Sequence, residues 1–194
     1  MIDYLQAADT QLFLFLNGKH NVFFDPIMYW FSDKLIWLPM YLLLASFMVW
    51  RYKRRGLVML LFVGVVVALC DQTASHLIKN AVMRLRPSHE PALAGLVHLS
   101  KAGAGGLYGF VSSHAANAFG LATFLGLVLE PRYRYLKYGL FAWAILVSYS
   151  RIYNGVHYPG DVIVAAIIGV AIGAVFAHVY AIVEKKMLKQ SEVK

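Results

Sequence analysis

The sequence predicts an all-α protein, built as a polytopic transmembrane helix bundle. Hydrophobic residues make up 60% of its 194 residues and charged residues only 14%, whereas a soluble domain is about half apolar and a quarter charged. The mean hydropathy is +0.60. Apolar stretches of helix length recur along the chain, separated by loops rich in proline, glycine or charge. We therefore expect a single membrane-embedded domain over residues 1–194.

Five clear spans are expected, at residues 35–50, 56–83, 111–129, 138–149 and 162–183. Residues 1–34 hold only a short apolar patch, and a bilayer needs about 20 apolar residues. We expect this N-terminal segment to be interfacial or to form a degenerate sixth helix. Residues 35–183 then form the transmembrane bundle and residues 184–194 a cytoplasmic tail. Two aspartates precede the first lysine, so no cleavable signal peptide is expected.

The positive charges indicate how the bundle is oriented. With five spans, the basic stretches 51–55, 131–137 and 184–194 fall on one face, which the lysine and arginine excess makes cytoplasmic. The loop 84–111 and the stretch 151–161 then face outward, toward the periplasm or exterior of a bacterial inner membrane. The net charge of +8 fits this bias and contact with anionic lipid. No basic stripe interleaved with exposed aromatic residues is present, so no nucleic-acid partner is expected.

A first polar cluster lies at the outer end of the second span. It contains Lys79, Arg84 and Arg86, followed by Pro87. Three cations at a membrane boundary could extend to the lipid headgroups. Positive charge on the outer face nevertheless runs against the topological bias. An anionic ligand explains these cations better.

A second cluster, Ser112, Ser113 and His114, opens the third span. Serines at a helix start commonly cap it. A helix N-terminus also presents free amides and partial positive charge, which together bind anions. His114 would lie beside an anion bound there.

The third cluster combines Arg151, His157 and Asp161. An arginine fork suits phosphate oxygens, and a histidine near neutral pH can act as nucleophile or proton carrier. Asp161 lies four residues after His157 and can hold one ring nitrogen. Together the three clusters supply charge neutralisation, amide donors, a nucleophile and an acid. These are the groups that phosphoryl transfer without a metal requires.

The three clusters resemble the three signature motifs of the type 2 phosphatidic acid phosphatase superfamily, membrane lipid phosphatases related to vanadium haloperoxidases. Lys79 and Arg86-Pro87 match the first motif, and Ser150-Arg151, His157 and Asp161 match the third. The second motif, usually Pro-Ser-Gly-His, reads Val-Ser-Ser-His at residues 111–114. Val111 and Ser113 thus depart from the pattern, and Ser113 puts the amide geometry of the phosphate cradle in question.

The resemblance implies a role for each matching residue. The catalytic residues would be His157, which attacks phosphorus to give a phosphohistidine; His114, which protonates the leaving oxygen and then activates water; and Asp161, which orients His157. The phosphate-binding residues would be Lys79, Arg86, Ser112, Ser113 and Arg151.

Outward-facing chemistry predicts a membrane lipid phosphate as substrate. The small size of the chain places undecaprenyl diphosphate first, with phosphatidylglycerol phosphate or a lipid A phosphate as alternatives of the same mechanism. A lipid or phosphate transporter is the alternative outside the enzymes, although no inverted repeat or pair of half-helices supports it.

No metal and no cofactor are expected. His20, His89, His98 and His178 show no metal-ligand spacing in the sequence. In the last span, small residues recur at intervals of four, at Ala165, Gly169, Gly173 and Ala177. Such spacing lets helix backbones approach closely. Packing within the bundle is the expected use, and a homodimer contact is the alternative.

Overall fold

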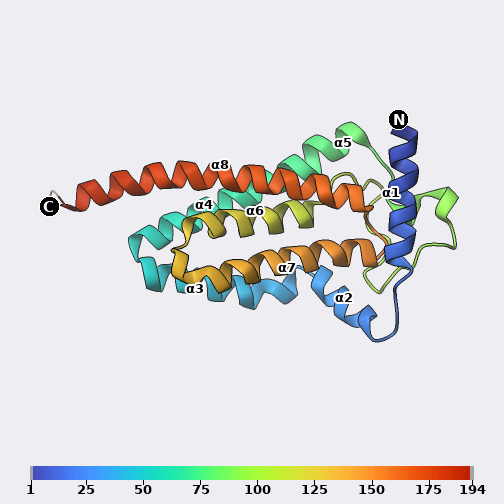
Figure 1. Cartoon of the computed structure of the whole chain (residues 1–194), viewed down its shortest axis with the longest axis horizontal. Coiled ribbons are helices and arrows are strands. Elements are labelled where there is room, and N and C mark those ends of the chain that lie inside the picture. Colours follow the sequence, from blue (N-terminus) through green and yellow to red (C-terminus); the bar gives the residue numbers. More distant parts are fainter. Residues whose placement is uncertain (1, 193–194) are drawn as a thin grey trace.

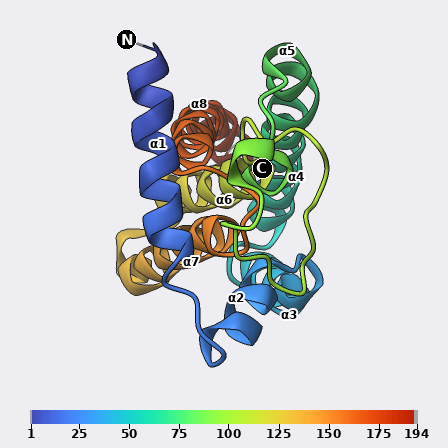
Figure 2. The same cartoon turned by 90° about the vertical axis from the view of Figure 1, so that its right-hand side faces the viewer.

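The structure, a computed structural model, describes residues 2–192 and is built of helices that run lengthwise, with one helix across their end (Figure 1). The lengthwise helices are α3 (Leu38–Tyr52), α4 (Arg54–Gln72), α6 (Ser113–Val128), α7 (Arg134–Tyr153) and α8 (Pro159–Glu192). α1 (Ile2–Asn17) crosses one end of this bundle, and the short α2 (Phe24–Ser32) follows it obliquely (Figures 1 and 2). The helical class predicted from the sequence is confirmed.

The second apolar stretch forms one continuous helix of three segments. α4 passes into a π-helical segment, Thr73–Ile78, and then into α5 (Lys79–Val82). Met83 adopts a left-handed conformation, with φ of 49°, and ends the helix. π turns often mark functional sites, and this one lies directly before Lys79, the first residue of the first cluster.

The five expected spans all form helices, but the membrane-spanning count is confirmed only in part. Within residues 2–192, three helices are long and apolar enough to cross a bilayer, namely Leu35–Tyr52, Arg54–Val82 and Pro159–Lys189. α6 is apolar but has only 16 residues, and α7 is not among the three. The sixth span is not confirmed either, because α1 lies across the bundle end rather than alongside its helices (Figure 2). The chain is an integral membrane protein.

The two ends of the bundle carry different chemistry. The α3–α4 turn, the α6–α7 turn and the C-terminal part of α8 lie together at one end, where Arg51 pairs with Glu130 at 3.0 Å and Arg55 with Glu184 at 3.2 Å. The long loop before α6, the α7–α8 turn and α1 lie at the other end (Figure 1). All three polar clusters therefore meet at the end opposite the basic turns.

Close packing of α8 on α6 holds these two helices in register. A Cβ on Gly169 would lie 2.4 Å from the carbonyl oxygen of Ala116, and one on Gly173 would lie 2.6 Å from that of Gly120. Such distances admit only glycine unless the backbones separate. The small residues of the last span thus pack inside the bundle, as the sequence analysis expected.

We predict that Gly169→Ala lowers the stability of the bundle. The new methyl group meets backbone atoms of α6 that cannot turn away, and overpacking of this kind costs about 1–3 kcal/mol. Gly139→Ala is the matched control, because a Cβ there meets no heavy atom of the described residues within 4 Å. Thermal unfolding in detergent micelles should show a lower midpoint for Gly169→Ala only. Equal midpoints for the two variants would contradict the packing argument.

Candidate active site

The third cluster lies on the turn that joins α7 to α8. Gly155 in this turn has φ of 76°, and a Cβ on it would lie 2.5 Å from the carbonyl oxygen of His98. Glycine therefore meets both a backbone and a space requirement. Pro159 begins α8. Its φ is already fixed near the helical value, and its missing N–H costs no hydrogen bond at the first helical position. The turn places His157 just before the helix and Asp161 in its first turn.

His157 and Asp161 form a buried pair. The ring Nδ1 of His157 lies 3.3 Å from Oδ2 of Asp161, and the same carboxylate oxygen accepts the backbone N–H of Tyr158 at 3.0 Å. The other ring nitrogen, Nε2, lies 3.3 Å from Nη1 of Arg86. Both His157 and Asp161 are almost completely buried. The ring is thus held from one side and presents Nε2 to a cation.

The partners of His157 define its tautomer. Arg86 can only donate, so Nε2 accepts, and Nδ1–H must donate to Asp161. Burial, and then the positive charges of Arg86, Arg151 and Lys79, hold the pKa of His157 well below its ordinary value. The ring is therefore neutral at pH 7, and its unprotonated nitrogen, Nε2, faces Arg86.

Arg86 is fixed by backbone carbonyls. Its Nε donates to the carbonyl of Tyr108 at 3.1 Å, and its Nη1 donates to that of Val156 at 3.2 Å. Cβ atoms added to Gly105 or Gly109 would each lie 3.1 Å from the Arg86 side chain. Burial lowers the pKa of Arg86, and the Asp161 charge opposes this shift. The guanidinium remains charged and oriented, because arginine does not lose its proton in proteins.

Arg151 and Lys79 add two further positive charges. Nη1 of Arg151 donates to the hydroxyl of Ser32 on α2. Its Nε is buried and has no hydrogen-bond partner among residues 2–192. Lys79 lies within electrostatic range of both Arg86 and Arg151. An unpaired buried donor amid three cations is costly, and phosphate oxygens would satisfy it.

The second cluster forms the start of α6 but does not cap it. Ser112 occupies the N-cap position, yet its hydroxyl is buried with no hydrogen-bond partner in the described part of the chain. The amide of Ser112 donates to the carbonyl of Asp161 at 3.3 Å. That amide therefore already has an acceptor, and the Ser112 hydroxyl is the group that lacks a partner. The amides of Ser113 and His114 follow in the first helical turn, where no intrahelical acceptor exists.

His114 faces the same cationic group from another side. It lies within electrostatic range of His157, Arg86 and Arg151. It also lines a cleft of about 540 Å³. The other lining residues come from the α2–α3 connection, α4 and α6, and they are Lys34, Gly64, Val67, Ala68, Asp71, Gln72 and Asn117. His114 thus lies close to the buried cations and also lines an open cleft.

Two further residues belong to this end of the bundle: Arg84, which the sequence analysis placed in the first cluster without a specific role, and Asp9, which no cluster contains. Nη1 of Arg84 lies 2.9 Å from Oδ1 of Asp161 and 2.8 Å from Oδ2 of Asp9 on α1. The guanidinium lies 3.9 Å from the centre of the Tyr158 ring. Oδ1 of Asp9 accepts the amide of Gly160 at 2.7 Å. Arg84 therefore binds Oδ1 of Asp161, the carboxylate oxygen that His157 does not contact. Asp9 joins α1 to the start of α8.

Comparison with known proteins assigns the family. The sequence pattern of the PAP2 superfamily matches residues 56–185, which contain all three clusters. The chain belongs to the PAP2 superfamily. The resemblance of the three motifs is thus confirmed, and the protein is a membrane PAP2 phosphatase, a hydrolase of phosphate esters.

Two sequence relatives are lipid A 4′-phosphatases. The protein from Bacteroides thetaiotaomicron is 40% identical over 171 residues, covering 87% of this chain and 75% of the relative. The protein from Porphyromonas gingivalis is 33% identical over 193 residues, covering 98% of this chain and 80% of the relative. Both alignments extend over more than one motif-bearing helix, so the likeness concerns the PAP2 domain as a whole.

Two solved PAP2 structures share the fold. Aquifex aeolicus LpxE aligns with a TM-score of 0.61 and 25% identity, over 86% of this chain and 93% of LpxE. A PAP2-type phosphatidylglycerolphosphate phosphatase from Bacillus subtilis aligns with a TM-score of 0.63 and 24% identity, over 89% and 84% of the two chains. The second likeness shows the fold alone.

The PAP2 pattern accounts for what the sequence analysis found and what it missed. The matched region, residues 56–185, leaves out α1 and therefore Asp9. It also leaves out Lys34 and Ser32, which reach the site from the N-terminal segment. These three residues have no motif spacing in the sequence. Only the fold of residues before α3 brings them to the cluster.

We predict that Arg84→Ala lowers kcat/KM for a lipid phosphate by about 10–100-fold, the range typical when a supporting partner of a site residue is removed. Asp161 would keep His157 as a hydrogen-bond partner but lose its ion pair with Arg84, and the His157 ring would be less firmly oriented. Arg132→Ala is the control, since it removes an ion pair with Glu130 at the opposite end. If both variants turned over at the wild-type rate, Arg84 would have no positioning role.

Acid should destabilise the wild-type protein more than the His157→Asn variant. The lowered pKa of His157 keeps this residue neutral in the folded state. In the unfolded chain the same side chain binds a proton below about pH 6.5. The contribution of His157 to the free energy of unfolding therefore falls with decreasing pH, by at most about 1.4 kcal/mol per unit below pH 6.5. Reversible unfolding in mixed micelles between pH 5 and 8 measures it. The two curves should run parallel above pH 7 and diverge below pH 6.5; parallel curves throughout would refute a neutral His157.

Proposed function

We propose that this PAP2 phosphatase removes a phosphate monoester from lipid A on the extracytoplasmic face of the inner membrane. The observation that carries the proposal is the pair of relatives named lipid A 4′-phosphatases, the first of them 40% identical over 87% of this chain. The sequence analysis placed undecaprenyl diphosphate first. The comparisons do not support that order and favour its alternative, a lipid A phosphate. They give the transporter alternative no support.

The cleft beside His114 is consistent with a sugar phosphate. Lys34, Gln72 and Asn117 offer polar side chains to its volume of about 540 Å³. The hydroxyl and amide groups of an acylated glucosamine would hydrogen-bond to such side chains. These side chains therefore offer hydrogen-bond partners to a sugar leaving group on the His114 side.

The first chemical step would be attack by Nε2 of His157 on phosphorus. Lys79, Arg86 and Arg151 surround the phosphate and neutralise the charge that grows on its oxygens. The unpaired Nε of Arg151 and the amides of Ser113 and His114 supply further donors. Asp161 holds Nδ1–H and stabilises the positive charge that forms on the ring. As the sugar–oxygen bond to phosphorus breaks, His114, which the negative charge of the bound phosphate keeps protonated, donates a proton to the departing oxygen.

The second step would release phosphate. His114, now neutral, accepts a proton from a water molecule that attacks the phosphohistidine, and the phosphorus–nitrogen bond breaks. The proton accounting closes, since His114 returns to its protonated form and His157 to its neutral form. In this scheme the cations do the work of a metal, so no metal ion takes part in the chemistry.

The charge distribution supports the outward orientation of the site. The basic turns and their ion pairs lie at the bundle end opposite the three clusters. The positive-inside bias makes the basic end cytoplasmic. The phosphatase would then act on lipid in the outer leaflet of the inner membrane.

We predict that purified protein, with EDTA present, releases phosphate from lipid A at least tenfold faster than from undecaprenyl diphosphate or phosphatidylglycerol phosphate. His157→Ala should reduce this rate by more than 10³-fold, because the nucleophile is lost. His178→Ala is the control, since His178 lies on the exposed side of α8. Quenching the reaction with ³²P-lipid A in alkaline SDS, where a phosphohistidine is stable, should trap a phosphoenzyme in wild-type and His178→Ala protein but not in His157→Ala.

Three results would overturn different parts of the proposal. A preference for undecaprenyl diphosphate would refute the substrate while leaving the chemistry intact. Turnover by His157→Ala near the wild-type rate would refute the nucleophile. If phosphate release by EDTA-treated protein, measured at low temperature, required added metal, the metal-free scheme would be refuted.

A further inference from the structure

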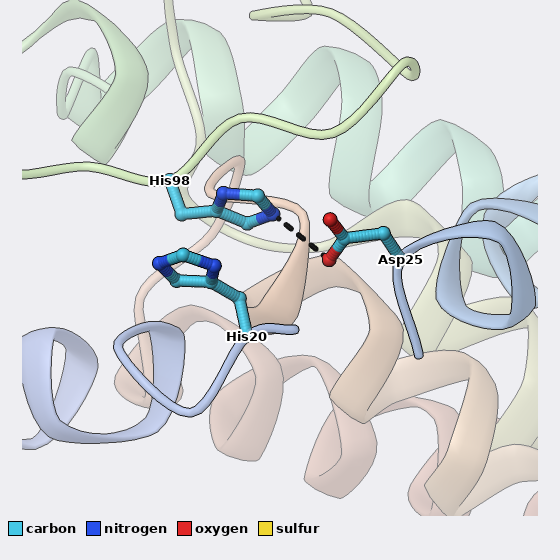
Figure 3. Close-up of side chains that lie close together, drawn as sticks. All are labelled: His20, Asp25 and His98. Atoms are coloured by element: carbon cyan, nitrogen blue, oxygen red, sulfur yellow. Dashed lines mark hydrogen bonds and ion pairs between the residues drawn. The ribbon is translucent and has the colours of Figure 1, made fainter. Parts of the chain in front are cut away.

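A further group of polar side chains, separate from the three clusters of the phosphatase site, lies where the N-terminal segment meets the long loop before α6. It consists of His20, Asp25 and His98 (Figure 3). The three potential ligand atoms all lie within 4.8 Å of one another. The imidazole rings of His20 and His98 are stacked, with centroids 3.8 Å apart and planes within 3°. Nε2 of His98 lies 3.1 Å from Oδ1 of Asp25.

We propose that His20, Asp25 and His98 bind one divalent transition-metal ion of the Zn²⁺ type. Two imidazoles and one carboxylate form a ligand set that zinc uses with a water molecule in the fourth position. Imidazole ligands favour Zn²⁺, Cu²⁺, Ni²⁺ or Fe²⁺ over Mg²⁺ and Ca²⁺, which prefer oxygen. The cluster is partly open to solvent, with His98 19% and Asp25 32% exposed in their side chains, so an ion can enter.

The cluster is supported by neighbouring residues in the way that metal ligands usually are. Oη of Tyr153 donates to Oδ1 of Asp25 at 2.7 Å. The side chain of Asn17 binds both backbone groups of His98. Its Oδ1 accepts the N–H of His98 at 2.8 Å, and its Nδ2 donates to the carbonyl of His98 at 3.0 Å. Such outer contacts orient ligands and are a regular part of metal sites. Asp25 and His98 are therefore positioned in advance, and His20 is the freest of the three ligands.

Only a small rearrangement would close the site around an ion. In a tetrahedral site with bonds of about 2.0–2.2 Å, ligand atoms lie about 3.3 Å apart. The two rings must tilt out of their parallel stack so that both nitrogen lone pairs point to one ion. This needs rotation about the terminal side-chain torsion of histidine, which is broad.

The position of the cluster indicates what a bound ion would do. Asn17 also donates to the carbonyls of Ile152 and Tyr153, at 3.3 and 2.8 Å, directly before the turn that carries His157. The loop at His98 packs on Gly155 of that turn. An ion at this cluster would therefore link the N-terminal segment and the long loop to the base of the catalytic turn. It would act as a structural clamp, apart from the phosphoryl chemistry.

The test uses full-length protein purified without a polyhistidine tag and stripped with a chelator. We expect one equivalent of Zn²⁺ to bind in a chelator competition, and Co²⁺ to give the visible absorption of a low-symmetry four-coordinate site. His20→Ala and His98→Ala should each weaken binding by at least tenfold. His89→Ala is the matched control, since His89 lies in the same long loop outside the cluster. Zn²⁺ should raise the thermal midpoint of wild-type and His89→Ala protein only.

Three results would overturn the proposal. These are stoichiometry well below one, affinity that is unchanged in His20→Ala, and a thermal midpoint insensitive to Zn²⁺. If His98→Ala failed to fold, His20→Ala would still decide the matter, because His20 is exposed and its removal leaves the Asn17 contacts in place. Phosphate release at low temperature should be the same in stripped and Zn²⁺-loaded protein, which separates the clamp from the catalytic scheme.

Discussion

The outer end of the bundle depends on the contacts that the buried carboxylate of Asp161 makes. A carboxylate without water is stable only when charged or polar donors surround it. Here the donors are His157, the amide of Tyr158 and the guanidinium of Arg84. These contacts fix the start of α8, the catalytic turn and the loop after α5 relative to one another. The backbone carbonyl of the same residue also binds the amide of Ser112 and so joins α6.

The cations of the site work against stability and in favour of binding. Arg86, Arg151 and Lys79 lie within range of one another, and part of their donor capacity is unpaired. Like charges held together in a poorly hydrated space repel, so the fold must supply the energy that keeps them there. A bound phosphate group relieves that repulsion. Burial, together with these positive charges, also lowers the pKa of His157 and keeps its nucleophilic nitrogen unprotonated.

The membrane-embedded half of the protein supplies the rigidity that the site needs. α6 carries Ser112 and His114 at its start, and α8 carries Asp161, so the geometry between them follows from how these two helices pack. Glycines at their contact bring the backbones too close for any side chain. Close packing of this kind replaces the hydrophobic driving force that is absent within lipid. The proposed metal clamp would act at the end of the bundle that carries the site, where the N-terminal segment covers the α7–α8 turn.

The sequence by itself determined the helical class, the apolar stretches and the three clusters, because hydropathy and motif spacing are local properties of the chain. It also indicated that the clusters share one face, since the charges of the loops define the two sides. Only the tertiary structure decided that α1 lies across the bundle, that Asp9 and Arg84 support Asp161, and that the Ser112 hydroxyl is not a cap. It alone brought His20 beside His98. Contacts between residues so distant in sequence leave no periodicity or spacing, because they arise from how separate helices and loops pack in space.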